Sequence, residues 1–396
     1  LCTMQFTSDR VASLSLPMTI EMSKKARALV AEGKDILNLS LGEPDFDSPN
    51  FVKDAGIQGI EDNFSHYMPV PGYPDLREAI VRKFHRDNGL TYQINEIVVS
   101  TGAKQSIANI VMASVNPGDE VLIPAPYWVS YADLARFAGG VVVSPKAGLD
   151  QKFKITAEQL DEALTDRCRL MIFSSPNNPS GAMYSKEELE SLAKVLERYP
   201  KVFVIADEIY EYIRYDNREH ASMASIESMR DRVATINGLS KGFAMTGWRL
   251  GYMGAPSFMA LACEKIQSQF TSGASSIAQR AAIAALDAGR PSIIYMQDAY
   301  TKRKDCLIKA LQPLEHLKMQ SPDGAFYLFV DVSAYLDETC PSSMELAMHV
   351  LDAGVATIPG DAFGLAGYLR ISYATDEATL TKAGERIVRC LKQRNQ

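Results

Sequence analysis

The residue whose surroundings best fit covalent chemistry is Lys241, which lies in a loop of small residues after an apolar run at 233–236. Arg249 follows eight positions later, with the spacing Lys-x(5)-Gly-x-Arg. A lysine amine forms a Schiff base with an aldehyde once its pKa is lowered towards neutrality. A nearby guanidinium lowers that pKa and also grips a phosphate with its planar fork. The pair therefore predicts an anchor for a phosphorylated aldehyde, and the alternative is a plain surface lysine in a Gly/Ser loop.

Short apolar runs that alternate with helix signals predict the frame for this loop. Capping boxes begin at Thr156 and Ser185, and each opens an amphipathic segment. Short continuous apolar strands separated by helices are typical of a mostly parallel sheet buried on both faces. The apolar runs are 97–99, 121–123, 141–143, 170–173, 202–206 and 233–236.

Ligands of open parallel sheets bind beyond the carboxyl ends of the strands, so the residues after each run are the candidates. Gly102 and Ala103 open a helix and offer backbone N–H groups to a phosphate, although a plain helix cap explains them as well. Trp128 could stack on a flat ring or belong to the core. Asn178 lies in a proline-stiffened turn that could simply be a turn or could present a hydrogen-bond donor.

A carboxylate and a phenol follow the run at 202–206. Asp207 ends an otherwise apolar strand, where an unpaired carboxylate is costly. A protonated ring nitrogen would pair with it, and Tyr210 could reach a phenolic oxygen of the same ring. A helix N-cap for Asp207 and a structural role for Tyr210 are the alternatives. Because Lys241 also follows a strand, all these groups are predicted to converge at one edge of the sheet.

The C-terminal part changes to α+β material, with strands at 326–332 and 368–373 and helices opened by Ser342 and running from 376. We predict a large three-layer α/β domain at 46–290. A smaller α+β domain is predicted from 1–45 together with 291–396, with a helix at 17–33 packed against the C-terminal part.

Composition is typical of an ordinary globular protein, and we expect a cytoplasmic location. The net charge of -7 argues against nucleic acid and anionic membranes as partners, and no apolar stretch is long enough to span a bilayer. No signal peptide is visible. The six cysteines and five histidines show no disulfide or metal-ligand spacing, so we expect free thiols and no metal.

Several motifs in the same order resemble the class I, fold-type I aminotransferases that depend on pyridoxal 5'-phosphate (PLP), over nearly the whole chain. Within them the sequence resembles the bacterial aspartate aminotransferase branch, which includes prephenate aminotransferases. The motifs are Gly42-Glu-Pro-Asp-Phe-Asp47, Pro126-Tyr-Trp-Val-Ser-Tyr131, Ser175-Pro-Asn-Asn-Pro-Ser-Gly181, Asp207-Glu-Ile-Tyr-Glu211, Ser240-Lys-Gly-Phe-Ala-Met-Thr-Gly-Trp-Arg249 and Leu369-Arg-Ile-Ser-Tyr373.

The resemblance implies a role for each cofactor-binding position. Lys241 would hold the PLP aldehyde and then move the substrate's α-proton, while Asp207 would keep the pyridine nitrogen protonated. The remaining contacts are implied as follows: Tyr210 and Asn178 at the ring oxygen, Trp128 on the ring face, Gly102, Ala103 and Arg249 at the phosphate, and Tyr67 reaching the phosphate from the neighbouring subunit of a homodimer.

The substrate site is implied by Arg370, which would grip the α-carboxylate beside Gly42, with Trp128 and Asn178 close by. Two features depart from relatives: Asn237 stands where many carry Ser or Thr, and the region 266–276 has no arginine for a distal carboxylate. Lys104 lies in the first turn of a helix, where a cation costs up to about 1 kcal/mol, so we predict that it binds that carboxylate.

The predicted reaction is transamination of L-aspartate with 2-oxoglutarate, which gives oxaloacetate and L-glutamate. A prephenate, aromatic or alanine aminotransferase and a β-lyase of the same fold stay open as alternatives. A PLP-sensing regulator is disfavoured, because the sequence has no added basic module that would bind DNA.

Overall fold

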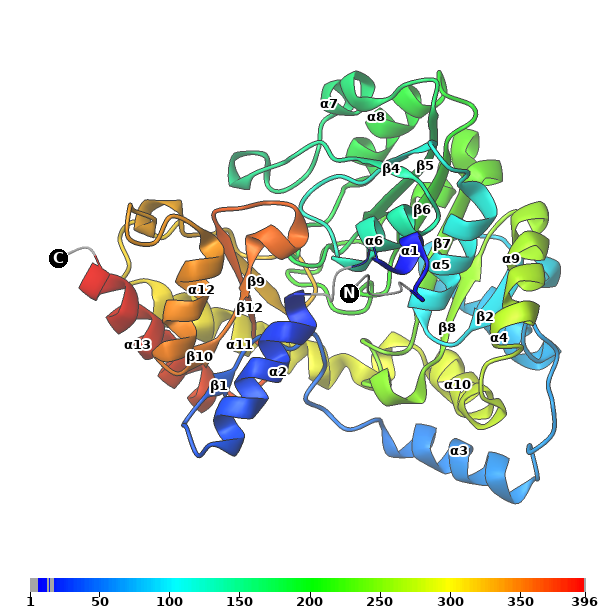
Figure 1. Cartoon of the computed structure of the whole chain (residues 1–396). Helices are drawn as coiled ribbons and strands as arrows, with labels where there is room; N and C mark the ends of the chain where they lie inside the picture. Colours follow the sequence, from blue (N-terminus) through cyan, green and yellow to red (C-terminus); the bar gives the residue numbers. More distant parts are fainter. Residues whose placement is uncertain (1–5, 13, 15–17, 395–396) are drawn as a thin grey trace.

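A seven-stranded sheet forms the centre of the larger part of the molecule (Figure 1). The computed structural model describes residues 6–12, 14 and 18–394. All neighbouring strands run parallel except β8, which is antiparallel to both of its neighbours. In spatial order the strands are β2 (Ile97–Ser100), β8 (Gly251–Gly254), β7 (Val233–Gly238), β6 (Phe203–Asp207), β5 (Cys168–Ser174), β3 (Glu120–Leu122) and β4 (Val141–Val143).

Helices cover both faces of this sheet, because successive strand residues point to opposite sides and both sides are apolar. The side chains of Val98 and Ile205 pack with one set of helices, α5 (Ala103–Ser114), α6 (Ser130–Phe137) and α9 (Ser257–Phe270). Those of Val99 and Val204 pack in the core that includes the other set, α4 (Pro74–Asn88), α7 (Ala157–Ala163), α8 (Lys186–Leu196) and α10 (Ser276–Ala288). Helix α3 (Asn50–Glu61) packs on α10.

Strand β8 was not predicted from the sequence, because its sequence, Gly-Tyr-Met-Gly, is typical of a loop. Its glycines let it pass very close to the start of α5, since a Cβ at Gly251 would lie 2.2 Å from the backbone nitrogen of Ala103. The strand begins two residues after Arg249 in the chain. The close approach therefore brings that arginine beside the beginning of α5.

A second, antiparallel sheet in the order β11–β12–β9 forms the centre of the smaller part, and β1 pairs with β10 in parallel. Helix α11 packs against α13, and α2 contacts β10 and β11, as predicted for the N-terminal helix. These elements are β1 (Leu37–Asn38), β9 (Tyr327–Asp331), β10 (Val355–Ala356), β11 (Ile358–Pro359), β12 (Tyr368–Ser372), α1 (Asp9–Ala12), α2 (Met18–Ala31), α11 (Ile294–Leu311), α12 (Ser343–Asp352) and α13 (Glu377–Arg394).

The predicted helix at 17–33 is shorter in the structure and ends at Ala31, and residue 17 lies outside the described residues. The division at about residue 290 stays a prediction, although α10 contacts the helices α3 and α4 while α11 contacts α13.

Candidate active site

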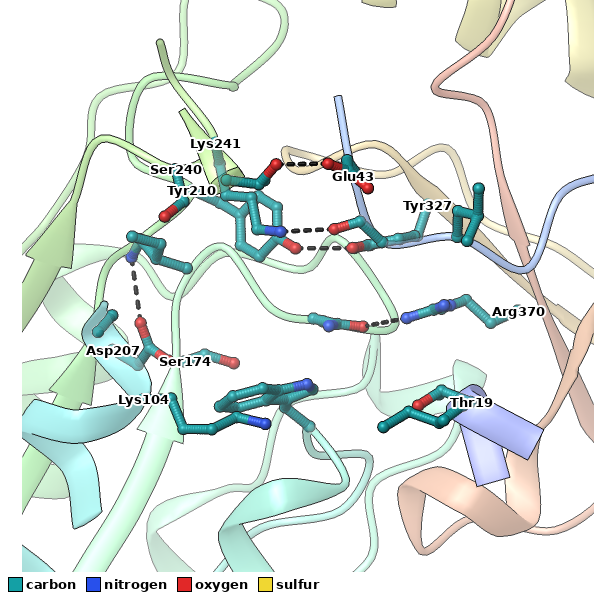
Figure 2. Close-up of a pocket in the computed structure, with 18 of the residues that line it drawn as sticks. Thr19, Glu43, Lys104, Ser174, Asp207, Tyr210, Ser240, Lys241, Tyr327 and Arg370 are labelled. Carbon is teal, nitrogen blue, oxygen red and sulfur yellow. Dashed lines mark hydrogen bonds between the residues drawn. The ribbon is translucent and has the colours of Figure 1, made fainter. Parts of the chain in front are cut away.

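A cavity of about 410 Å³ lies at the carboxyl ends of the parallel strands (Figure 2). It receives side chains that follow β2, β3, β5, β6 and β7, together with residues of α2, β9 and β12. The predicted site residues that line it are Gly42, Ala103, Lys104, Trp128, Asn178, Asp207, Tyr210, Lys241, Arg249 and Arg370. The convergence predicted from the strand ends is therefore present in the structure, although the roles assigned to the individual residues stay predictions.

Lys241 lies in the cavity wall, and its amine donates a hydrogen bond to the carbonyl oxygen of Gly42. Burial, helped by the positive charges of Arg370 and Arg249, lowers the pKa of this amine to about 8. Glu43 acts in the opposite direction. The sequence predicted that a nearby guanidinium lowers this pKa, and burial is the larger cause in the structure. An amine with a pKa near neutrality is suited to attack an aldehyde and to exchange protons.

Asp207 is a buried carboxylate at the end of β6 that accepts hydrogen bonds from two donors. The Tyr131 hydroxyl donates to its Oδ2 at 2.6 Å, and the backbone N–H of Ile209 donates to its Oδ1 at 3.2 Å. Burial raises the pKa of Asp207 to about 6 despite these two hydrogen bonds. Among the described residues it forms no salt bridge, so its negative charge lacks a cationic partner.

Arg370, on β12, is the buried cation of the cavity. Its Nη1 donates to Asn178 Oδ1 at 3.0 Å and its Nη2 donates to the Ser40 carbonyl oxygen at 2.7 Å. The guanidinium lies over the ring of Tyr327, 4.4 Å from the ring centroid. Its Nε has no hydrogen-bond partner in the described part of the chain. Asn178 accepts the hydrogen bond from Arg370 through its oxygen, and its use as a donor through the amide nitrogen stays a prediction.

Arg249 lies against the start of α5, where the sequence predicts a phosphate seat. Arg249 has left-handed backbone, and its Nη1 donates to the carbonyl oxygen of Thr246 at 2.9 Å. A Cβ at Gly102 would lie 2.5 Å from Nη2 of Arg249, so the guanidinium packs directly on this residue, whose φ of +82° also favours glycine. Gly102 itself does not line the cavity.

Lys104 points over the indole of Trp128, with its amine 4.8 Å from the ring. Burial and the charge of Arg249 lower the pKa of Lys104. Figure 2 shows this lysine and Arg370 on different sides of the cavity, so two cations face the space between them.

Sequence reasoning missed several cavity residues. Tyr131 stands in a motif that the resemblance quoted, but nothing in its type or position identified it as the partner of Asp207. Tyr327, on β9, lies far along the chain and carries no signal. The N-terminal helix α2 was predicted as packing material only, yet it contributes Thr19, Ile20, Ser23 and Arg27 to the cavity wall.

Tyr67 lies outside the cavity, in the loop between α3 and α4, and its side chain is 97% exposed. Asn237 is buried, and its Nδ2 has no hydrogen-bond partner among the described residues. Its oxygen instead accepts a hydrogen bond from the backbone of Gly238.

A cluster of two carboxylates and a histidine lies next to the turn after β6, and the sequence did not predict it. Glu208, Glu211 and His220 lie close enough together to hold a metal ion. Lys83 already supplies a buried cation there through its ion pair with Glu211. The absence of a metal stays a prediction.

Two further expectations concern the rest of the chain. The five cysteines that the structure describes are free thiols, and Cys2 lies outside the described residues. Within the described ranges, no helix has both the length and the hydrophobicity that a bilayer crossing requires.

Comparison with known protein families identifies the family of this chain. The family model "Aminotransferase class I and II" matches residues 34–387. The chain belongs to this aminotransferase family. The match covers the whole of the cavity except the contribution of α2, and it confirms the predicted resemblance.

Two curated relatives of this aminotransferase cover nearly its whole length. The "Bifunctional aspartate aminotransferase and glutamate/aspartate-prephenate aminotransferase" of Petunia hybrida is 45% identical, over 97% of this chain and 82% of the relative. The "Aspartate/prephenate aminotransferase" of Cereibacter sphaeroides is 42% identical, over 97% and 98% of the two chains.

Solved structures confirm the mostly parallel α/β fold of the aminotransferase. The aspartate aminotransferase of Rhizobium meliloti is 39% identical and gives a TM-score of 0.95, covering 98% of this chain and 99% of that one. The enzyme of Thermus thermophilus with maleate gives 0.93 at 39% identity, covering 98% and 100%.

Proposed function

We propose that this aminotransferase uses PLP to transfer the amino group of L-aspartate to 2-oxoglutarate, which yields oxaloacetate and L-glutamate. The observation that carries the proposal is that Lys104 and Arg370 line the same cavity as Lys241. Two cations across one cavity suit a substrate with two carboxylates. The names of the relatives support aspartate as the donor, and the maleate bound by the Thermus enzyme is likewise a dicarboxylate.

The cavity residues fit PLP by their chemistry. Asp207 is a buried carboxylate without a cationic partner among the described residues, which a protonated pyridine nitrogen would supply. Arg249 beside Gly102 and Ala103 offers a guanidinium and a helix start to a phosphate. Trp128 and Tyr210 stand in the cavity wall, where an aromatic face and a phenol could contact a ring. When bound, PLP would supply an electrophilic aldehyde and an electron-accepting ring.

The protein's own groups would then share the work. Lys241 would hold the aldehyde and carry the proton at the substrate's α-carbon, for which a pKa of about 8 is well placed. Arg370 would bind the α-carboxylate, because it is a buried cation in the cavity wall and its hydrogen bonds to Asn178 and Ser40 fix its direction. Lys104 would bind the distal carboxylate.

We also propose that the enzyme is a homodimer in which Tyr67 completes the phosphate site of the neighbouring subunit. The nearly complete exposure of Tyr67, together with that of Ile57 and Ile60 in the preceding helix α3, supports a partner contact, since exposed apolar patches mark protein–protein interfaces. A cytoplasmic location is proposed from the free thiols of the described cysteines.

The test replaces Lys104 by alanine and compares kcat/KM for aspartate and for alanine as amino donors, with 2-oxoglutarate as acceptor. The aspartate/alanine ratio should fall by about tenfold to a hundredfold, because a charged hydrogen bond to the distal carboxylate is lost. Lys186→Ala is the matched control, since Lys186 also lies in the first turn of a helix but not in the cavity.

An unchanged ratio in Lys104→Ala would remove Lys104 from the specificity site and favour a monocarboxylic or aromatic donor. The cofactor itself is tested separately: purified protein should show the absorbance of lysine-linked PLP, and Lys241→Ala should lose it together with turnover. Release of ammonia and pyruvate instead of transfer would point to a β-lyase.

Prephenate is a second candidate acceptor, because the relatives from Petunia and Cereibacter carry that activity in their names. Prephenate also has two carboxylates and would use the same pair of cations. Turnover with prephenate and either aspartate or glutamate as donor, measured beside 2-oxoglutarate, decides which acceptor the cavity prefers.

A further inference from the structure

Two buried tyrosine hydroxyls meet in the wall of the cavity. The oxygens of Tyr210 and Tyr327 lie 2.7 Å apart, and Figure 2 shows the hydrogen bond between them. Tyr210 belongs to the turn after β6, whereas Tyr327 begins β9 of the second sheet. Among the described residues, neither hydroxyl has another hydrogen-bond partner.

The direction of this hydrogen bond decides what Tyr210 can do. Each phenol carries one proton, and the pair uses one of the two. If Tyr210 donates to Tyr327, it has no proton left for a ligand. If Tyr327 donates, the proton of Tyr210 has no acceptor in the described protein and is free for an acceptor in the cavity.

Arg370 favours Tyr327 as the donor. Its guanidinium lies over the Tyr327 ring, 4.4 Å from the centroid, where its positive charge stabilises negative charge developing on that phenol. Burial raises the pKa of Tyr327, and Arg370 opposes this rise. Gly42 fixes the hydroxyl from the other side, since a Cβ there would lie 2.8 Å from its oxygen.

We infer that Tyr327 donates its proton to Tyr210 and is thereby a positioning residue, which aims the Tyr210 proton at an anionic oxygen of the bound ligand. Under the proposed function, on which this inference rests, that oxygen is the ring oxygen of PLP. Tyr327 would thus link the sheet that carries Arg370 to the turn that carries Asp207.

The test is Tyr327→Phe, which keeps the ring under Arg370 and removes only the hydroxyl. A donor to the ring oxygen stabilises its negative charge, so a weaker donor should raise the pH midpoint at which lysine-linked PLP changes absorbance. We expect the ionisation constant to fall about threefold, as for partial loss of one hydrogen bond. Affinity for maleate should stay within about twofold of wild type, because the Arg370 surroundings are kept.

Tyr373→Phe is the matched control. Its hydroxyl donates to the Tyr215 hydroxyl at 3.1 Å, in an equally buried pair that does not line the cavity. Removal of this hydroxyl should change neither the absorbance midpoint nor maleate affinity. A purely structural effect of losing a buried phenol would appear in both variants.

Two further variants keep the inference open to refutation. Placing 3-fluorotyrosine at position 327 keeps the ring and makes the hydroxyl a stronger donor, so the midpoint should move down. Tyr210→Phe combined with Tyr327→Phe should match Tyr210→Phe alone, because Tyr327 acts only through Tyr210.

A lower midpoint in Tyr327→Phe would show that Tyr210 is the donor, because removal of its acceptor would free its proton for the ring oxygen. An unchanged midpoint in both the phenylalanine and the fluorotyrosine variants of position 327 would show that Tyr327 does not act through Tyr210. Either result would make the inference wrong. Failure of the wild-type protein to link PLP through Lys241 would instead overturn the proposed function. The two failures are therefore distinguishable in one set of spectra.

Discussion

At the scale of single residues, burial in the cavity wall disfavours the charged forms of the groups that would do the chemistry. Asp207 illustrates this, because burial raises the pKa of its carboxyl to about 6 while Tyr131 and the Ile209 N–H oppose the rise. Lys241 is the converse case, with a pKa lowered by burial to about 8. A ligand with a cationic group would stabilise the Asp207 carboxylate, and a ligand with an aldehyde would react with the Lys241 amine.

The raised pKa of the Asp207 carboxyl predicts that the stability of the cofactor-free protein depends on pH. Its folded pKa of about 6 exceeds the ordinary value of 3.8, so the folded state binds more protons than the unfolded state between these values. Stability should therefore fall as pH rises through this window, by about 3 kcal/mol from this group. Asp207→Asn keeps an acceptor for Tyr131 and should lose this component.

Denaturant unfolding of both cofactor-free proteins at about pH 4 and pH 7 measures the difference. Between about pH 4 and pH 7 the free energy of unfolding of Asp207→Asn should rise relative to that of the wild type. Parallel pH profiles would contradict the assigned burial cost.

At the scale of elements, the turn after β6 separates a ligand side from an anchoring side. Asp207 and Tyr210 face the cavity, while Glu208 and Glu211 are buried behind them. Asn88, at the end of α4, joins the two glutamates, since its Nδ2 lies 2.8 Å from Glu211 Oε2 and 3.2 Å from Glu208 Oε2.

Three more side chains complete the anchor. Lys83 of α4 forms a buried ion pair with Glu211 and donates to Asn88 Oδ1 at 2.7 Å. His220 and Ser222 each lie 2.8 Å from Glu208 Oε2. The position of the turn is thus fixed by a charged network as well as by apolar packing.

Lys83→Met should destabilise the protein by about 3–5 kcal/mol, because it leaves Glu211 buried without its cation. The double variant with Glu211→Gln should recover part of the loss, since no unpaired charge remains. Arg82→Met is the control on the same helix. Its ion pair with Asp287 is half exposed on both sides, so it should cost less than about 1 kcal/mol.

Unfolding free energies of the single and double variants give the coupling directly. Equal losses for Lys83→Met and Arg82→Met would mean that the buried network does not hold the turn.

At the scale of the whole molecule, the cavity is built by two sheets and by α2, and we propose that a second subunit completes it. Tyr67 is 97% exposed, and other large apolar side chains near it in the chain, Ile57 and Ile60 of α3, are also more than half exposed. A two-fold dimer would bring the same face of both copies together and bury them.

A mixture of two variants that each lack one part of the proposed shared site tests this arrangement. Lys241→Ala and Tyr67→Phe, refolded together, should form dimers in which the site that keeps Lys241 receives Tyr67 from the other chain. Activity should recover to about a quarter of wild type, since half of the dimers are mixed and each has one complete site.

Lys241→Ala mixed with Asp207→Asn is the control, because both residues belong to the same subunit's cavity and no complete site can form. A fully active monomer in analytical ultracentrifugation would rule the dimer out.

The sequence by itself determined the strands of the large sheet other than β8, and the identity of the groups at their ends. Apolar runs too short for helices, separated by capping boxes, can be buried only in a covered parallel sheet, and the residues after them must then meet at one edge. Lys241, Asp207 and Arg370 were found in this way or through the motifs around them, because the information lies within a few neighbouring residues.

Only the tertiary structure decided the partners of these groups. Tyr131 and Tyr327 reach Asp207 and Tyr210 from distant parts of the chain, the glycines of β8 set Arg249 against the start of α5, and α2 closes one wall. The balance of causes behind the low pKa of Lys241 was decided there as well. Such contacts depend on how separate elements pack, and local patterns of residue type do not encode that packing.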